Sequence, residues 1–207
     1  MTTLHINPAT RALLNDRVAG FPDRRASEEK KAAAVAITVL EADGEPAIVV
    51  TKRQPRLKDH GGQWALPGGR LDAGESAVDA ARREMAEEVN LVVDETQVLG
   101  LLDDYVTRSG YVITPVVIWS GIEIGSLVPN PDEVASIHAF TFAELLRTDS
   151  PNLERIPESD RQVLSMNYLD DVMYAPTAAM LYQFREVALL GLDTRVAHFD
   201  QPLFAWK

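Results

Sequence analysis

The sequence contains no cysteine. Disulfides, thiolate zinc sites and a cysteine nucleophile are therefore excluded. The chain also lacks an excess of basic residues, because 20 lysines and arginines face 31 aspartates and glutamates, for a formal charge of −11. Nucleic-acid-binding proteins are usually basic, so the overall charge argues against nucleic acid as a partner. An acidic enzyme that acts on phosphates would need a metal ion or a local basic patch.

Long apolar runs are absent as well. Residues 1–14 hold no hydrophobic stretch of signal-peptide length, and the most apolar segment, 111–122, is too short to cross a membrane. These absences predict a cytoplasmic protein with no membrane partner. The chain shows no repeats and no low-complexity segment. Its 207 residues are 46% hydrophobic, so we expect a single domain over 1–207 with a real core.

Local patterns predict a mixture of helices and strands. Asn7 and Pro8 are suited to the N-cap and first turn of a short helix over 7–21. Asp43 and Gly44 predict a tight hairpin between two β-rich runs. The expected strands are 31–40, 46–53, 96–106, 110–120 and 134–140; the expected helices are 75–89, 141–147 and 176–191, and 148–160 is expected to be a loop. This order favours a layered α+β fold.

The segment 82–91, RREMAEEVNL, gathers three carboxylates on one side of the predicted helix 75–89. Glu84, Glu87 and Glu88 fall within about 100° of arc. Like charges at this spacing repel, and carboxylates near a helix C-terminus oppose the helix dipole. A solvated helix face is the alternative. However, the segment 54–75, rich in glycine and proline, leads into the helix and is long enough to be functional. A hard cation such as Mg²⁺, which takes carboxylate oxygens together with substrate phosphates, would relieve the repulsion.

Residues 69–91, GRLDAGESAVDAARREMAEEVNL, resemble the Nudix box. All its charged positions are filled, and one residue departs from the pattern: Asn90 stands where the family has glycine, at a helix end where asparagine also adopts the left-handed conformation. The resemblance implies a Nudix α/β/α sandwich with a mixed β-sheet between helices. Its core would span about 32–190, with an N-terminal helix and a C-terminal extension. It also implies Mg²⁺- or Mn²⁺-dependent hydrolysis of a small-molecule diphosphate.

The same resemblance assigns roles to residues of this chain. It implies that Glu84 and Glu88 are the principal metal ligands, with Glu87 as a further ligand and the carbonyl of Gly68 as a contributor. Two further residues would orient the loop and helix, namely Glu75 and Arg83. The general base would be a carboxylate of the box or one downstream. Glu133 is the downstream candidate, and a solvated loop residue is the alternative for it.

Residues 51–69, TKRQPRLKDHGGQWALPGG, are similar to the accessory motif of coenzyme A diphosphatases. Thr51, Arg53, Leu57, His60, Gly62, Pro67, Gly68 and Gly69 match that motif, whereas Gln54, Lys58, Gln63 and Leu66 depart from it. The densest basic cluster of the chain lies here, and the extra phosphate of coenzyme A requires such a patch. A loop that only offsets net charge is the alternative. The expected substrate-binding residues are Arg53, Arg56, Lys58, His60, Gly68 and Gly69.

Two other functions stay open from the sequence. The substrate could instead be ADP-ribose, NADH or another nucleoside diphosphate derivative, or the chain could be a ligand-binding regulator that hydrolyses nothing. The intact carboxylates and the lack of a basic helix-turn-helix segment argue against the regulator. Family members are often dimers, so a homodimer is one option. The tail 195–207 is expected only to cover the sheet, if it has a role.

Overall fold

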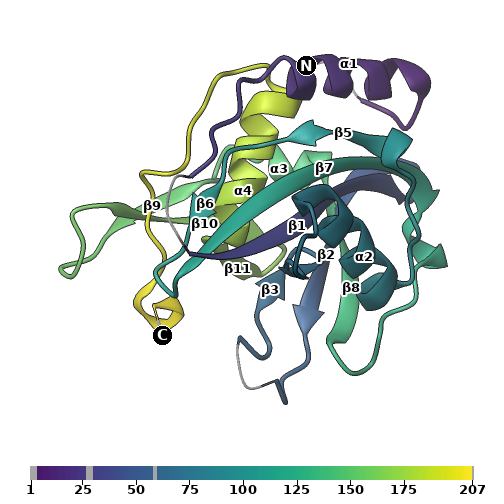
Figure 1. Cartoon of the computed structure of the whole chain (residues 1–207). Helices are drawn as coiled ribbons and strands as arrows, with labels where there is room; N and C mark the ends of the chain where they lie inside the picture. Colours follow the sequence, from purple (N-terminus) through teal and green to yellow (C-terminus); the bar gives the residue numbers. More distant parts are fainter. Residues whose placement is uncertain (1–3, 27–29, 58–59, 207) are drawn as a thin grey trace.

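The computed structural model describes residues 4–26, 30–57 and 60–206. An α+β fold results, with a mixed sheet between helices (Figure 1). Strand β1 lies at the centre of the sheet, antiparallel to β2 on one side and parallel to β7 on the other. The main sheet contains β1 (Lys31–Ala42), β2 (Glu45–Arg53), β3 (Trp64–Ala65), β4 (Gly68–Arg70), β5 (Val98–Leu101), β6 (Tyr105–Val106), β7 (Tyr111–Glu123) and β8 (Val134–Thr141). The helices are α1 (Pro8–Ala19), α2 (Ala77–Val89), α3 (Phe142–Leu145) and α4 (Thr177–Phe184).

The hairpin between β1 and β2 forms as the sequence predicts. Asp43 and Gly44 both have positive φ angles, 51° and 81°, which is the backbone of a two-residue hairpin turn whose twist matches that of the strands. The helix at the amino terminus is also confirmed, because the side chain of Asn7 accepts a hydrogen bond from the backbone of Thr10.

Alternating side chains of β1 divide the interior into two cores, one on each face of the sheet. Ile37 and Val39 pack with α1 and α4 in one core, whereas Ala36 and Leu40 pack with α2 in the other. Figure 1 shows α2 in front of the sheet and α4 behind it. The sheet is therefore covered on both faces, as the expected sandwich requires.

Strands β1 and β2 pair only near their hairpin and then separate. Their register extends from Ala42–Glu45 to Val39–Ile48, after which β1 pairs with β4 and β2 pairs with β3. The short strands β3 and β4 thus enter the opening between the two long ones. This divergence places the glycines of β4 at the base of a cavity.

Helix α2 has both of its predicted ends. The side chain of Ser76 accepts a hydrogen bond from the backbone of Asp79 at the start, so the helix begins just after Glu75. At the other end Asn90 adopts the left-handed conformation, with φ 56° and ψ 35°. Asparagine therefore ends the helix where the family pattern has glycine.

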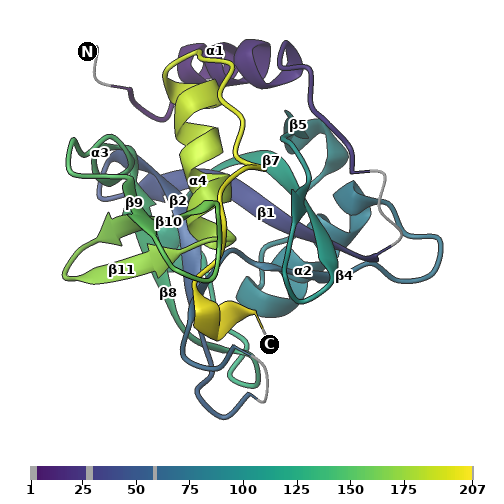
Figure 2. The ribbon, with the colours of Figure 1, turned by 90° about the vertical axis from the view of Figure 1, so that its left-hand side faces the viewer.

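The structure corrects the sequence-based expectations in the carboxyl-terminal third. The predicted loop 148–160 contains strand β9 (Asn152–Arg155), whose four residues are all exposed and carry no hydrophobic alternation. A second sheet follows, in which β10 (Gln162–Tyr168) lies between β9 and β11 (Asp171–Tyr174) (Figure 2). The predicted helix 176–191 is α4 followed by a π-helical turn, Arg185–Leu189. The predicted helix 141–147 contains only the four residues of α3.

Candidate active site

The glycines of β4 allow the strand to approach α2 more closely than any other residue would. A Cβ atom at Gly69 would lie 2.1 Å from Oε1 of Glu84, and one at Gly68 would lie 2.4 Å from the backbone oxygen of Ala34. Real Cβ atoms do not make such contacts. Gly69 therefore brings the β4 backbone against the carboxylate of Glu84 on α2, whereas Gly68 brings it against β1.

Glu84 and Glu88 are the buried carboxylates of this contact. Their exposed fractions are 8% and 2%, although both are charged in water. The backbone N–H of Gly68 lies 3.4 Å from Oε1 of Glu88. Burial raises the pKa of both carboxyls, and that of Glu88 to about 8, against the charge of Arg53 and the Gly68 N–H, which lower it. The charges of neighbouring glutamates add to the increase.

Arg83 connects the loop before α2 with the carboxylates of the helix. Its guanidinium donates to both carboxylate oxygens of Glu75, at 2.9 and 3.0 Å, in a forked pair. It also donates to Glu84 at 2.8 Å, to Glu87 at 3.0 Å and to the backbone oxygen of Arg70 at 3.0 Å. These bonds raise the pKa of Arg83 and lower that of Glu75, in each case chiefly through the hydrogen bond that joins them. Glu75 and Arg83 thus join the loop before α2 to the helix.

The other two predicted carboxylates, Glu87 and Glu133, differ in burial and in the groups that they face. Glu87 is exposed and turned toward Arg83 rather than toward the glycines. Glu133 is half-buried, and its charge contributes to the raised pKa of both Glu84 and Glu88. The loop before β8 is fixed to α2, since the N–H of Asn130 donates to the backbone oxygen of Glu88. The negative charge of Glu133 therefore interacts with the two buried carboxylates, Glu84 and Glu88.

The donor set suits a hard divalent cation. Burial raises the pKa of both carboxyls, and only Arg83, Arg53 and one N–H favour their charged form within the described chain, so a bound cation would stabilise that charged form. In the same described residues, no three acidic or histidine side chains lie close enough to hold a metal by themselves. Mg²⁺ is commonly held by one or two carboxylates and completes its shell with water and substrate phosphate, so Glu84 and Glu88 fit that pattern.

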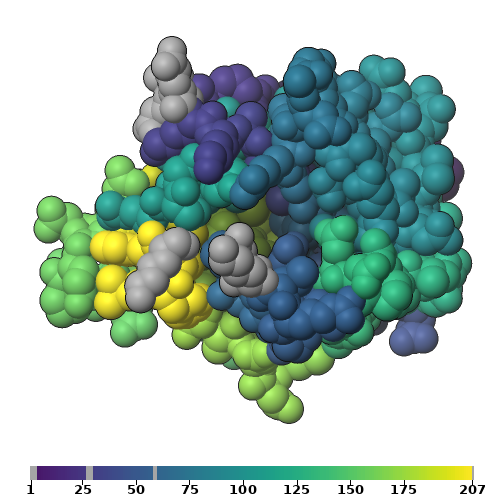
Figure 3. All heavy atoms as spheres, turned by 60° about the horizontal axis from the view of Figure 1, so that its bottom comes forward, coloured from purple at the N-terminus to yellow at the C-terminus, as the bar shows by residue number. Residues whose placement is uncertain are grey.

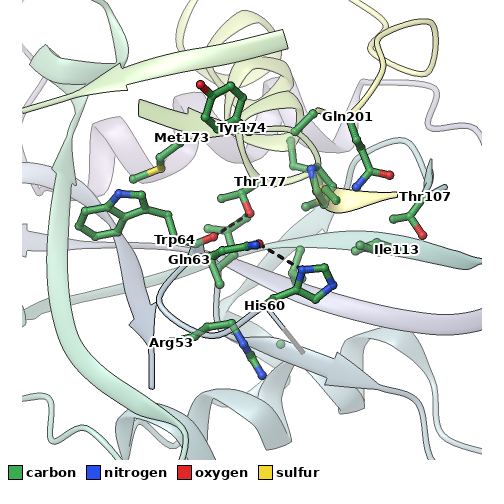
Figure 4. Close-up of a pocket in the computed structure, with 18 of the residues that line it drawn as sticks. Arg53, His60, Gln63, Trp64, Thr107, Ile113, Met173, Tyr174, Thr177 and Gln201 are labelled. Atoms are coloured by element: carbon green, nitrogen blue, oxygen red, sulfur yellow. Dashed lines mark hydrogen bonds between the residues drawn. The ribbon is translucent and has the colours of Figure 1, made fainter. Parts of the chain in front are cut away.

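A cavity of about 940 Å³ opens beside Gly68 and Gly69. Figure 3 shows it as a hollow bordered by the yellow carboxyl-terminal tail and the blue segment of β2 and β3. Its walls come from β1, β3, β4, β7 and β11 and from the start of α4. Figure 4 shows Trp64 and Met173 on one side of the cavity and Thr107 and Ile113 on the other. This volume is large enough for a nucleotide-sized ligand.

The predicted basic cluster reaches this cavity only in part. Arg53 lines it, and the Nε atom of Arg53 is buried without a hydrogen-bond partner in the described chain. Arg56 does not line the cavity, and its guanidinium is paired with Asp132 at 2.7 Å. Lys52 lines the cavity but pairs with Asp171 at 3.0 Å. Lys58 lies outside the described residues.

His60 and Trp64 take part in local contacts at the cavity wall. His60 has a φ of 57°, and its Nδ1 atom lies 3.1 Å from Oε1 of Gln63, the residue that replaces the acid of the motif (Figure 4). The ring of Trp64 packs edge-on against Tyr168, and its Nε1 donates to Asp171 at 2.9 Å. These contacts hold Trp64 in the cavity wall.

The carboxyl-terminal tail forms a wall of the cavity, which the sequence did not predict. Asp200 is buried and accepts hydrogen bonds from Arg108 and Ser159, which fixes the tail beside β7. The next residues lead to a short 3₁₀ helix, Leu203–Ala205, in which Phe204 lines the cavity and packs edge-on against Tyr174 at 5.4 Å. The aromatic residues at the end of the sequence were the available signal.

Comparisons with known proteins agree with this geometry. A family model described as the NUDIX domain matches residues 30–164. The chain is 32% identical over 185 residues to the uncharacterised Nudix hydrolase NudL of Pectobacterium atrosepticum, with 85% of this chain and 95% of that protein covered. It is 36% identical over 121 residues to the mitochondrial coenzyme A diphosphatase NUDT8 of Homo sapiens, with 57% and 51% covered. The solved Nudix hydrolase RenU of M. smegmatis has a similar fold, with a TM-score of 0.52, 22% identity, and 78% of this chain and 87% of that chain covered.

No helix within the described residues is long and apolar enough to cross a membrane.

Proposed function

The chain belongs to the Nudix hydrolase family, and from this premise we propose that it is a divalent-metal-dependent diphosphatase of coenzyme A or its derivatives. The products would be 4′-phosphopantetheine and 3′,5′-ADP. The observation that carries the reaction class is that two glycines lining a large cavity, Gly68 and Gly69, contact the buried carboxylates Glu88 and Glu84. This arrangement supports a diphosphate bound with its bridging region beside β4.

Each residue of the site has a role in the proposed reaction. Glu84 and Glu88, with the carbonyl of Gly68, would hold Mg²⁺ or Mn²⁺. When bound, the metal supplies charge neutralisation of the phosphate oxygens and a water of lowered pKa. Arg83 holds Glu84 in place and ties it to the loop through Glu75, while Glu87 shares the same guanidinium. Arg53 supplies a positive charge at the cavity wall.

Glu133 is the proposed general base. Its charge contributes to the raised pKa of both Glu84 and Glu88, which supports a carboxylate close to the proposed metal ligands. A base must come within hydrogen-bond reach of the proton it takes, and the loop that carries Glu133 is fixed by backbone bonds to α2 and to Gln54. Replacement by glutamine removes the base and keeps these backbone bonds.

A second candidate function keeps the reaction and changes the substrate to ADP-ribose, NADH or a similar molecule. The observation that favours it is the internal pairing of the predicted basic cluster. Lys52 and Arg56 are already bound to Asp171 and Asp132, so the loop offers fewer free cations than its sequence suggests. The substrate assignment to coenzyme A rests on the motif of residues 51–69 and on the relative named a coenzyme A diphosphatase.

The direct experiment is incubation with Mg²⁺ or Mn²⁺ and a panel of coenzyme A, acyl-coenzyme A, ADP-ribose and NADH, with identification of products. Coenzyme A should yield 4′-phosphopantetheine and 3′,5′-ADP, and Glu84→Gln and Glu88→Gln should abolish the reaction. Turnover of ADP-ribose or NADH without turnover of any coenzyme A derivative would reject the substrate. If both substitutions leave hydrolysis intact, the proposed metal site is wrong.

A further inference from the structure

The sheet register places three large side chains on the cavity side of the sheet. Along β1, Lys31 lies six residues before Ile37, so the two side chains point to the same face of the sheet. Ile37 packs in the core with α4. In the register, Tyr111 of β7 lies beside Lys31, and Arg70 of β4 lies opposite Ala33. Neighbouring residues in register share a face, so Lys31, Arg70 and Tyr111 lie on the same side of the sheet. All three line the cavity.

The two cations converge on one aromatic ring. The ammonium of Lys31 lies 5.6 Å from the centre of the Tyr111 ring, and the guanidinium of Arg70 lies 5.3 Å from it. In the described chain neither cation has a carboxylate partner, in contrast to Lys52 and Arg56. Two positive charges with no carboxylate partner among the described residues, in a chain of net charge −11, form a local electrostatic site for an anionic ligand.

The cluster of Lys31, Arg70 and Tyr111 lies next to the proposed reaction centre along β4. Arg70 directly follows Gly69, so its Cα lies roughly 7 Å along the strand from that of Gly68. Thr107 and Ser109, whose hydroxyls lie 3.2 Å apart, line the same end of the cavity. It is the side of Thr107 and Ile113 in Figure 4, opposite Trp64. A ligand with its diphosphate at Gly68 and Gly69 would therefore present its adjoining sugar to these cations.

We propose that Lys31, Arg70 and Tyr111 form an anion subsite that binds a phosphate monoester on the sugar next to the diphosphate. The inference rests on the proposed function, in which that group is the 3′-phosphate of coenzyme A. Arg70 and Lys31 bind the phosphate oxygens through charge-assisted hydrogen bonds. Tyr111 is a positioning residue, because its ring holds the two cations side by side. The subsite thus supplies the positive charge that the paired residues Lys52 and Arg56 do not.

The test compares coenzyme A with dephospho-coenzyme A, which lacks only the 3′-phosphate. The wild type should show a kcat/KM for coenzyme A roughly tenfold above that for dephospho-coenzyme A, the factor expected from one or two charge-assisted bonds at a partly exposed site. The double variant Lys31→Gln, Arg70→Gln should bring this ratio close to one, because it lowers kcat/KM for coenzyme A more than kcat/KM for dephospho-coenzyme A. Arg70→Lys should keep part of the preference. Arg155→Gln, which removes an exposed charge outside the cavity, is the matched control and should keep all of it.

A second readout keeps this inference separate from the proposed function. Calorimetry measures the binding of adenosine 3′,5′-bisphosphate and of 5′-AMP to the wild type and to the double variant. If coenzyme A is hydrolysed and the double variant retains the preference, the subsite is wrong and the proposed function stands. If coenzyme A is not hydrolysed, the proposed function is wrong. The subsite then survives only if the wild type binds the bisphosphate more tightly than 5′-AMP and the double variant does not.

Discussion

Glu88→Gln should abolish hydrolysis and also stabilise the metal-free protein at alkaline pH. Glu88 is 2% exposed, and burial raises its pKa from 4.5 to about 8 in the folded protein. The folded state therefore binds a proton more tightly than the unfolded state does. The stability that this group contributes is fully present below pH 4.5 and is lost as the pH rises through about 8. Glutamine has nearly the same shape and stays neutral throughout.

The size of the effect follows from the same pKa. At about 1.36 kcal/mol for each pH unit, the wild type without metal loses roughly 5 kcal/mol between pH 4.5 and alkaline pH. The amide of glutamine can keep the bond from the Gly68 N–H through its oxygen, but its own NH₂ group requires a partner. A buried unsatisfied donor costs about 1–3 kcal/mol. We therefore expect the variant to exceed the wild type by about 2–4 kcal/mol at about pH 8.5.

The assay is urea unfolding in the presence of a chelator at about pH 5 and about pH 8.5. The wild type should lose stability between the two, whereas Glu88→Gln should lose less, because only the raised pKa of Glu84 remains in it. Adding Mg²⁺ should restore the wild type by mass action and leave the variant unaffected. Glu87→Gln is the matched control, because Glu87 is exposed and its removal should not alter the difference between the two pH values. The reasoning is refuted if Glu88→Gln is no more stable than the wild type at the higher pH without metal.

Three further substitutions test other parts of the site. Gly69→Ala places a Cβ atom 2.1 Å from Glu84, so the carboxylate must move. We expect a folded protein whose kcat/KM falls about 10–100-fold in steady-state assays, and unchanged kinetics would show that this contact is unimportant. Arg83→Lys removes the forked pair with Glu75 and should lower the free energy of unfolding, measured by urea titration, by about 1–3 kcal/mol. If the variant is as stable as the wild type, a single ammonium holds Glu75 as well as the guanidinium does. Asp200→Asn weakens the bonds from Arg108 and Ser159 that hold the tail, and should raise KM while kcat stays unchanged. A fall in kcat with constant KM would contradict a role of the tail in substrate binding alone.

The proximity of the carboxylates in the proposed reaction centre could be predicted from the sequence because they are close together along the chain. Glu84 and Glu88 are four residues apart on a helix whose ends are set by Ser76 and Asn90, so helical geometry alone places them together. The hairpin at Asp43 and Gly44 is local for the same reason. Short-range rules of capping and periodicity therefore account for the sheet centre, for α2 and for the carboxylates.

The cavity could not be predicted because its walls depend on contacts between distant segments. The pairing of Lys52 with Asp171 joins positions 119 residues apart, and that of Arg56 with Asp132 joins positions 76 residues apart. A cluster of basic residues in the sequence does not reveal which of them are paired with carboxylates in the folded chain. Strand β9 escaped detection since its residues are exposed and are held only by pairing with β10.

The tethered tail has a consequence for how this protein can diversify. The family model ends at residue 164, yet β11, the start of α4 and the 3₁₀ helix at Leu203–Ala205 form one side of the cavity. The groups that would cleave the bond and many of those that would select the molecule thus lie in separate stretches of the chain. Substitutions in the last stretch can change substrate preference without touching the carboxylates. Exchange of this stretch between relatives is therefore a route to new specificity with the same chemistry.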